Sequence, residues 1–194
     1  YEKNWSIKKV VTLRIIGIDP GLRNTGWGII ELKGNRLVHV DDGRISPSSM
    51  LSIGERLLFL KNKLKVIVEK YDPNLSAIEQ IFVGPGTGSS LKLGMARGVS
   101  ILVLAQAGIG IKELPPKLVK KTVTGYGSAS KDQIKSMIEK LLNIIPKNED
   151  SSDALAIAIS AQHIGYDNIN SKLSQNYNGL NAAIEKALLK EKNV

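Results

Sequence analysis

The hydrophobic pattern of the N-terminal part of the chain predicts three consecutive strands. An apolar run over residues 13–19 ends at a Pro-Gly turn, a second apolar run covers 25–32, and a third candidate strand covers 36–45. Short apolar runs separated by Gly-rich or Pro-rich turns are typical of a strand meander. We therefore expect an antiparallel arrangement of these first three strands.

Helical periodicity begins after a Ser-Pro break near residue 46. Apolar residues recur at spacings of three and four over residues 51–70, which predicts an amphipathic helix that ends near Asp72. The segment 90–107 is apolar on nearly all sides, so it should be buried in a core or against a partner. Two further helices are expected over residues 130–142, with Ser130 as the cap, and over 151–164.

Two short apolar segments, 75–81 and 109–114, alternate with these helices and read as the remaining strands. Three strands followed by alternating helices and strands predict an α/β fold, in which a mixed sheet is flanked by helices. Pro115 and Pro116 end the last strand, and a basic segment follows over 117–127. We expect one domain over residues 13–164 and an N-terminal extension over 1–12. A C-terminal tail that is partly helical is expected over 165–194.

Composition points to a polyanionic partner and removes several kinds of site. The 194 residues carry 27 Lys and Arg against 18 Asp and Glu, for a net charge of +9, and nucleic acid is the commonest polyanion. The absence of cysteine excludes disulfides, thiolate metal sites and a cysteine nucleophile, and it fits a reducing, cytoplasmic location. No apolar stretch reaches the roughly 18 residues that cross a membrane, so no membrane partner is expected.

Four acidic residues stand where a carboxylate needs an explanation. Asp19 and Glu79 lie at the C-terminal ends of apolar predicted strands, where sites gather in α/β sheets and where a buried unpaired charge is costly. Asp150 and Asp153 are three residues apart at the start of an apolar helix and share one face. Each alone is compatible with an ordinary turn aspartate or a helix-end charge. Together, without a His cluster, they indicate a hard ion such as Mg²⁺ or Mn²⁺.

A pair of such ions suggests a reaction. Two ions about 4 Å apart can activate a water and stabilise the leaving oxygen in phosphodiester cleavage. A basic protein with an acidic pocket suits this chemistry, because its basic residues hold the nucleic acid while the ions bring the phosphate among the acids. The basic candidates are Lys117, Lys120 and Lys121, together with Lys92 and Arg97, which are either phosphate contacts or solvated charges.

Five segments resemble the RuvC family of Holliday junction resolvases, in order and in spacing. They read GIDPGLRNTGWGII, AIEQIF, LKLGMARGV, VKKTVTGYGSASKDQI and DSSDALAIAI, and together they cover about residues 13–164. The first segment alone is weak evidence, since actin-like ATPases and other nucleases of the ribonuclease H fold begin with similar turns. All five together are highly specific.

This resemblance implies a ribonuclease H-like fold and a crossover junction endodeoxyribonuclease. Such enzymes are homodimers that resolve four-way DNA junctions by paired symmetric nicks in recombination and repair, leaving 5′-phosphate and 3′-hydroxyl ends. The resemblance also implies two Mg²⁺ per subunit, with Mn²⁺ able to substitute, and partnership with the RuvA–RuvB branch-migration complex.

Carried over by motif, the resemblance gives roles to individual residues. Lys120 and Lys131 match basic residues near the scissile strand, and Phe82 matches an aromatic residue that packs against bases at the junction centre. The loop after Phe82 is richer in glycine than the family pattern, and some members carry His where this chain has Asp150. The residues that match the catalytic, metal-binding carboxylates are Asp19, Glu79, Asp150 and Asp153.

Three alternatives remain open at the level of sequence. An actin-like ATPase would use the Asp19–Gly21 turn for phosphates, but this chain lacks the length and the second Gly-rich turn of that fold. A catalytically inactive junction-binding protein of the same fold fits poorly with the presence of all four acids. A nuclease of the ribonuclease H fold acting on another nucleic acid, such as an RNA·DNA hybrid, is the third.

Overall fold

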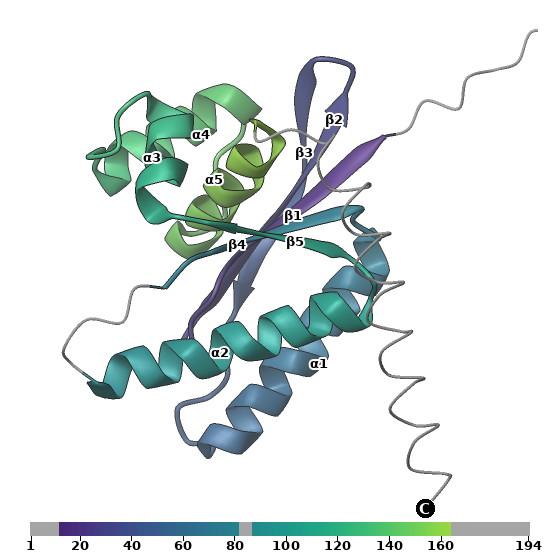
Figure 1. The fold of residues 1–194 in the computed structure, drawn as a ribbon, viewed down its shortest axis with the longest axis vertical. Helices are drawn as coiled ribbons and strands as arrows, with labels where there is room; N and C mark the ends of the chain where they lie inside the picture. The colour runs from purple at the N-terminus through teal and green to yellow at the C-terminus, as the bar shows by residue number, and fades with distance from the viewer. Residues whose placement is uncertain (1–11, 82–86, 164–194) are drawn as a thin grey trace, which may run out of the picture. The chain divides into compact units, whose positions relative to one another are not determined.

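Five strands form one mixed sheet in a computed structural model, which describes residues 12–81 and 87–163 (Figure 1). The order across the sheet is β3-β2-β1-β4-β5, with β1, β2 and β3 antiparallel and β4 and β5 parallel to β1. The predicted mixed sheet with three antiparallel leading strands is therefore confirmed. The strands are β1 (Leu13–Asp19), β2 (Thr25–Lys33), β3 (Arg36–Ile45), β4 (Leu75–Glu79) and β5 (Gly110–Leu114).

Helices cover both faces of the sheet (Figure 1). One face carries α1 (Ile53–Tyr71) and α2 (Thr87–Gln106), and the other carries α3 (Pro116–Thr124), α4 (Lys131–Leu142) and α5 (Glu149–His163). Capping residues explain where the predicted helices begin and end. Ser52 and Ser130 each form a capping box with the residue three positions on, and Asp72 ends α1 in the left-handed conformation.

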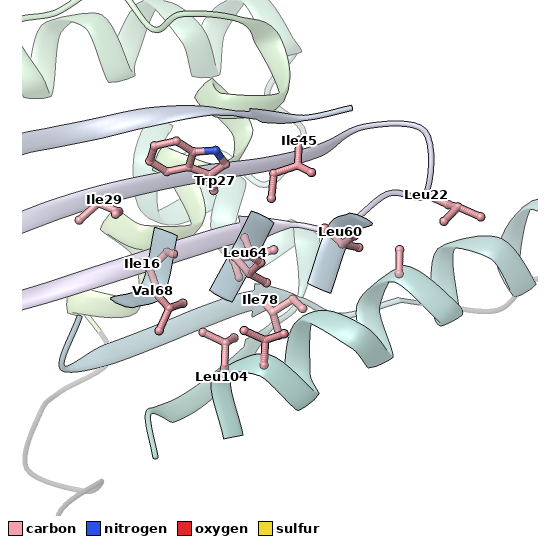
Figure 2. Packing of buried hydrophobic residues seen from close by; sticks show 13 residues of the cluster. Ile16, Leu22, Trp27, Ile29, Ile45, Leu60, Leu64, Val68, Ile78 and Leu104 are labelled. Carbon is pink, nitrogen blue, oxygen red and sulfur yellow. The ribbon is translucent and has the colours of Figure 1, made fainter. Parts of the chain in front are cut away.

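The strands divide their side chains between two cores, because successive residues of a strand point to opposite faces. Ile16 and Ile18 belong to the cluster that packs against α1 and α2, where Figure 2 shows Leu64 of α1 and Leu104 of α2 close to the sheet. Trp27 of β2 belongs to the same cluster, so the sequence-based reading of Trp27 as a packing residue is confirmed.

One element was not predicted. The proline pair at the end of β5 does more than end the strand, because Pro116 opens helix α3, whose Val119 and Val123 are buried. Proline suits the first turn of a helix, where its missing N–H has no partner to lose. The basic segment is thus a short amphipathic helix with lysines on its open side.

The compact unit of the fold extends to Ala161. The expected C-terminal tail, and the expected N-terminal extension apart from Thr12, lie outside the described residues. Within the residues that the structure describes, no helix is long and apolar enough to cross a membrane.

Candidate active site

Two of the four acids meet because their strands are parallel neighbours. Asp19 is the last residue of β1 and Glu79 the last of β4, and the ladder pairs Ile18 with Ile78 just before them. Their side chains therefore leave the sheet at the same edge. A cavity of about 300 Å³ opens there, and its charged lining residues are Asp19, Glu79, Asp153, Lys120 and Lys131.

Helix α5 brings the third acid because its backbone lies directly on the sheet. A Cβ atom at Gly17 would stand 2.1 Å from the carbonyl oxygen of Ala154, and one at Gly28 would stand 2.7 Å from Leu155 Cγ. A side chain at either of these two glycines would push the helix outward. The glycines of β1 and β2 thus set how closely Asp153 approaches the strand ends.

The cavity gathers more negative charge than its surroundings neutralise. Burial, followed by the negative charges of Asp153, Glu79 and Asp150, raises the pKa of Asp19 to about 7, and the positive charge of Lys131 partly opposes this increase. Burial also raises the pKa of Glu79 and that of Asp153, each with a smaller contribution from a neighbouring carboxylate. A cation in this cavity would relieve the mutual repulsion of these groups.

Two of the acids are held by basic side chains. Lys131 Nζ lies 3.3 Å from Asp153 Oδ2, and the negative charge of Asp153 raises the pKa of Lys131. Asp150 does not line the cavity; its Oδ2 lies 3.3 Å from Nη1 of Arg44 on β3. Sequence reasoning missed Arg44, although its place in the ladder beside Gly26 of β2 brings it to the same end of the sheet.

The carboxylate oxygens at this site are of the type that binds a hard metal ion, although the acids are not positioned closely enough together to coordinate one. Across the described ranges, no three His, Cys, Asp or Glu side chains are positioned together to hold a metal ion. The acids at the cavity nevertheless supply only carboxylate oxygens, the ligands that Mg²⁺ and Mn²⁺ prefer. Two of the four acids are paired with basic side chains, Asp150 with Arg44 and Asp153 with Lys131.

The predicted DNA-binding lysines fall into two groups. Lys120 and Lys131 line the cavity, and Lys120 Nζ also donates to the carbonyl of Ala129, which ties α3 to the turn before α4. Lys117 and Lys121 are exposed on α3. This cluster places positive charge beside the acids, where a phosphate backbone would approach.

The remaining predicted contacts lie elsewhere. Arg97 is occupied within the protein, since its Nε donates to the carbonyl oxygen of Glu79 at 3.2 Å and its guanidinium pairs with Glu113 of β5. Lys92 is exposed on α2 and lines a different cavity. Phe82 lies outside the described residues.

Comparison with known proteins gives a consistent result. The family model described as crossover junction endodeoxyribonuclease RuvC matches residues 15–161. The crossover junction endodeoxyribonuclease RuvC of Ruegeria pomeroyi is 49% identical over 79% of this chain and 93% of its own length. The protein of the same name from Rhodopseudomonas palustris strain BisA53 is 47% identical over 78% of this chain and 87% of its own length.

Solved structures agree with these relatives. T. thermophilus RuvC in complex with Holliday junction substrate is similar with a TM-score of 0.71 and 25% identity, over 76% of this chain and 92% of that chain. The yeast mitochondrial Holliday junction resolvase is similar with a TM-score of 0.55 over 76% of this chain and 78% of that one. Its identity of 14% supports the shared fold alone.

Proposed function

The chain belongs to the RuvC family of crossover junction endodeoxyribonucleases, and we propose that it resolves four-way DNA junctions by paired symmetric nicks that leave 5′-phosphate and 3′-hydroxyl ends. The observation that carries this proposal is the convergence of Asp19, Glu79 and Asp153 in one cavity that also contains Lys120 and Lys131. Phosphodiester cleavage needs both a place for cations and a basic rim for the strand. Its cellular setting would be homologous recombination and repair.

Asp19, Glu79 and Asp153 would hold the ions, with Asp150 as the fourth carboxylate. The family is metal-dependent, and we propose two Mg²⁺ per subunit, with Mn²⁺ as a substitute. When bound, these ions supply an activated water and charge stabilisation for the leaving oxygen. The position of Glu79 would be fixed through its backbone, because Arg97 Nε donates a hydrogen bond to the carbonyl oxygen of Glu79.

The lysines have a separate task. Lys131 partly neutralises Asp153 and would exchange this contact for a phosphate when a cation arrives. Lys120 is anchored at Ala129 and keeps a positive charge at the wall of the cavity. Both side chains would position the scissile phosphate without taking part in proton transfer. Lys117 and Lys121 would extend the basic surface along α3, and Phe82 would pack against the bases at the junction centre.

The proposal extends to partners and location. A homodimer would present two carboxylate cavities to the two strands of like polarity in a junction. Partnership with RuvA–RuvB and a cytoplasmic location are supported by family membership and, for location, by the absence of cysteine.

Cleavage of a synthetic four-way junction tests the activity. The junction is incubated with Mg²⁺ beside a linear duplex of the same sequence and an RNA·DNA hybrid, and the ends are read by ligation. Symmetric, directly ligatable nicks in the junction, with little cutting of the other substrates, are expected. Preferential cutting of the hybrid would instead favour the alternative nuclease.

A further inference from the structure

A second, larger cavity begins on the turn that follows Asp19. Its volume is about 730 Å³, and it is lined by the Gly21–Asn24 turn, the segment after β3, the first turn of α1 and the second turn of α2. It shares no lining residue with the carboxylate cavity, whose helical wall comes from α3, α4 and α5. The chain thus passes from Asp19, which lines the carboxylate cavity, directly into a turn that lines the second cavity.

The second cavity is uniformly basic. Arg23 comes from the turn, Arg56 from α1 and Lys92 from α2, and no acidic residue lines the cavity. Arg23 and Lys92 are exposed, and neither forms an ion pair with any described residue. Three separate segments thus converge on one hollow with like charges, which repel one another unless an anion lies between them.

Arg56 is the fixed member of the group. Its Nη2 donates to the carbonyl oxygen of Leu22 at 2.8 Å, and its Nε is buried without a hydrogen-bond partner. No carboxylate forms an ion pair with this guanidinium among the residues that the structure describes. A partly buried, unneutralised arginine held at a cavity wall is suited to bind phosphate, to which a guanidinium offers several N–H donors.

We propose that this basic cavity binds phosphates of the DNA backbone next to the scissile phosphate. The inference rests on the proposed function, because the Gly21–Asn24 turn that lines the basic cavity comes directly after Asp19 and Pro20, and Asp19 lines the carboxylate cavity. A strand crossing this turn passes from the acids at Asp19 to the cations at Arg23 and Arg56. The cavity would therefore hold the strand while the acids act on it.

A polymer explains the cavity better than a single anion does. Inorganic phosphate or a mononucleotide shares the same chemistry, but the three cations come from separate segments around a hollow of about 730 Å³. Successive phosphates of one strand provide charges at intervals, as such an arrangement requires. A test must therefore compare a strand with free phosphate.

Salt dependence of junction binding tests the contacts. Binding is measured from low to moderate salt with Ca²⁺ in place of Mg²⁺, for the Arg23→Gln/Lys92→Gln double variant and for Arg56→Gln. Each lost phosphate contact should reduce the slope of log affinity against log salt by roughly 0.9, so the double variant should lose about 1.8 for each subunit bound to the junction, or about 3.6 for a dimer. Arg23 and Lys92 are both exposed, and a wild-type slope in this double variant overturns the proposal.

Lys65→Gln is the matched control. Lys65 is also on α1, nine residues from Arg56 and thus on the opposite side of the helix, and it pairs with Glu69. The substitution removes the same charge, so its slope should equal that of the wild type. A control slope reduced as much as that of Arg56→Gln would reveal a general charge effect and overturn the assignment to the cavity.

A second measurement separates the two levels of inference. Amide resonances of Gly21–Asn24 are followed while the full chain is titrated with a short single-stranded oligonucleotide or with inorganic phosphate. Shifts at much lower concentrations of the oligonucleotide support the strand, whereas equal responses identify a free-anion site and overturn it. If those amides respond to the strand but no junction is cut, the proposed function fails while the cavity assignment stands. Normal junction cleavage by the wild type, together with unaltered salt-dependence slopes in the variants, would instead support the proposed function and overturn the cavity assignment.

Discussion

A Cβ atom at Gly26 would lie 2.0 Å from the carbonyl oxygen of Asp150. Gly26 pairs with Asp19 in the ladder between β1 and β2, so the first turn of α5 is seated beside the strand end that carries Asp19. The contact is between two backbones and cannot be relieved by turning a side chain. One glycine in β2 thus controls the distance between acids from two distant parts of the chain.

Gly26→Ala should separate these acids without removing any of them. The added methyl group must displace the N-terminus of α5, and misplacement of catalytic groups by about 1 Å can cost roughly 100-fold in rate. Junction cleavage should fall by about that factor, and unfolding free energy by about 1–3 kcal/mol from overpacking. Gly54→Ala, at a helical position with open space around it, should leave cleavage unchanged. Cleavage by Gly26→Ala within twofold of the wild type would contradict this account.

Neutralising the carboxylates should separate chemistry from binding. Asp19→Asn, Glu79→Gln and Asp153→Asn each remove a charge from the cavity but leave the basic surface intact. Junction cleavage should fall by orders of magnitude while junction affinity is retained, because phosphate contacts dominate affinity. Single-turnover cleavage and gel-shift assays measure the two effects.

Asp150→Asn should be the mildest of the four substitutions. Asp150 lies outside the carboxylate cavity and pairs with Arg44. Its charge should therefore influence the groups in the cavity less than the charges of the other three acids do. Glu69→Gln, an exposed neutralisation on α1, serves as the control and should cleave normally. Near-normal cutting by Asp19→Asn would remove the basis for the proposed site.

The stability of the metal-free protein should depend on pH because the pKa of Asp19 is raised in the folded state. Burial, followed by the charges of Asp153, Glu79 and Asp150, raises the pKa of Asp19 to about 7. The unfolded chain ionises Asp19 near pH 4, so the folded state is relatively destabilised as the pH rises from 4 through 7. The difference approaches about 4 kcal/mol above that range. In EDTA, Asp19→Asn should therefore melt at a higher temperature than the wild type at pH 8.

This stability difference should shrink towards pH 4, where Asp19 is protonated in the folded state and close to its pKa in the unfolded chain, so that ionisation no longer favours the unfolded state appreciably. Mg²⁺ should raise the melting temperature of the wild type at pH 8 more than that of Asp19→Asn, because a ligand that binds the folded state stabilises it. Thermal unfolding at pH 4, 6 and 8, with and without Mg²⁺, measures both effects. A pH-independent difference between the two proteins would contradict the raised pKa.

Metal choice should follow the same chemistry. Mg²⁺ and Mn²⁺ should support junction cleavage, whereas Ca²⁺ should support binding with little cutting, because its larger and looser coordination shell misplaces the attacking water. Cleavage assays with each ion at equal ionic strength compare them. Equal turnover with Ca²⁺, or any turnover in EDTA, would argue against the proposed metal site.

Local patterns predicted most of the fold because strand alternation, helix periodicity and caps are encoded within a few residues. The boundaries of β1 and β3 and the cap at Ser130 follow directly from such signals. Helix α3 was missed because its proline pair and lysines resemble a loop, and its short apolar stripe at Val119 and Val123 gains meaning only against the sheet.

The site was predictable only where topology follows from simple rules. Parallel strands align their ends, so Asp19 and Glu79 could be expected to meet. The pairing of Arg44 with Asp150 spans 106 positions in the chain, and no local pattern signals it. The hold of Arg97 on the carbonyl of Glu79 depends likewise on how α2 crosses the sheet.

Helix α2 carries an open stripe on the side away from the core. Leu91 and Leu102 are 62% and 51% exposed, and a Cβ at Gly94 or Gly98 would meet no atom within 4 Å. These four positions follow one another at spacings of three and four, so they share one face. The buried residues of the helix, Ala96, Ser100, Val103 and Leu104, lie on the opposite side.

Gly98→Glu should convert a dimer to monomers. Two-fold pairing of these open stripes would cover the exposed leucines, and glycines at the contact let two helix backbones approach closely, which a buried carboxylate would prevent. The variant should sediment as a monomer, bind junctions more weakly and make single rather than paired nicks. Ile145→Glu adds the same charge at a side chain that is 82% exposed and outside α2, and it should leave the sedimentation unchanged. A wild-type protein that is monomeric at micromolar concentration, yet makes both nicks within the lifetime of one junction complex, would defeat the argument for a dimer.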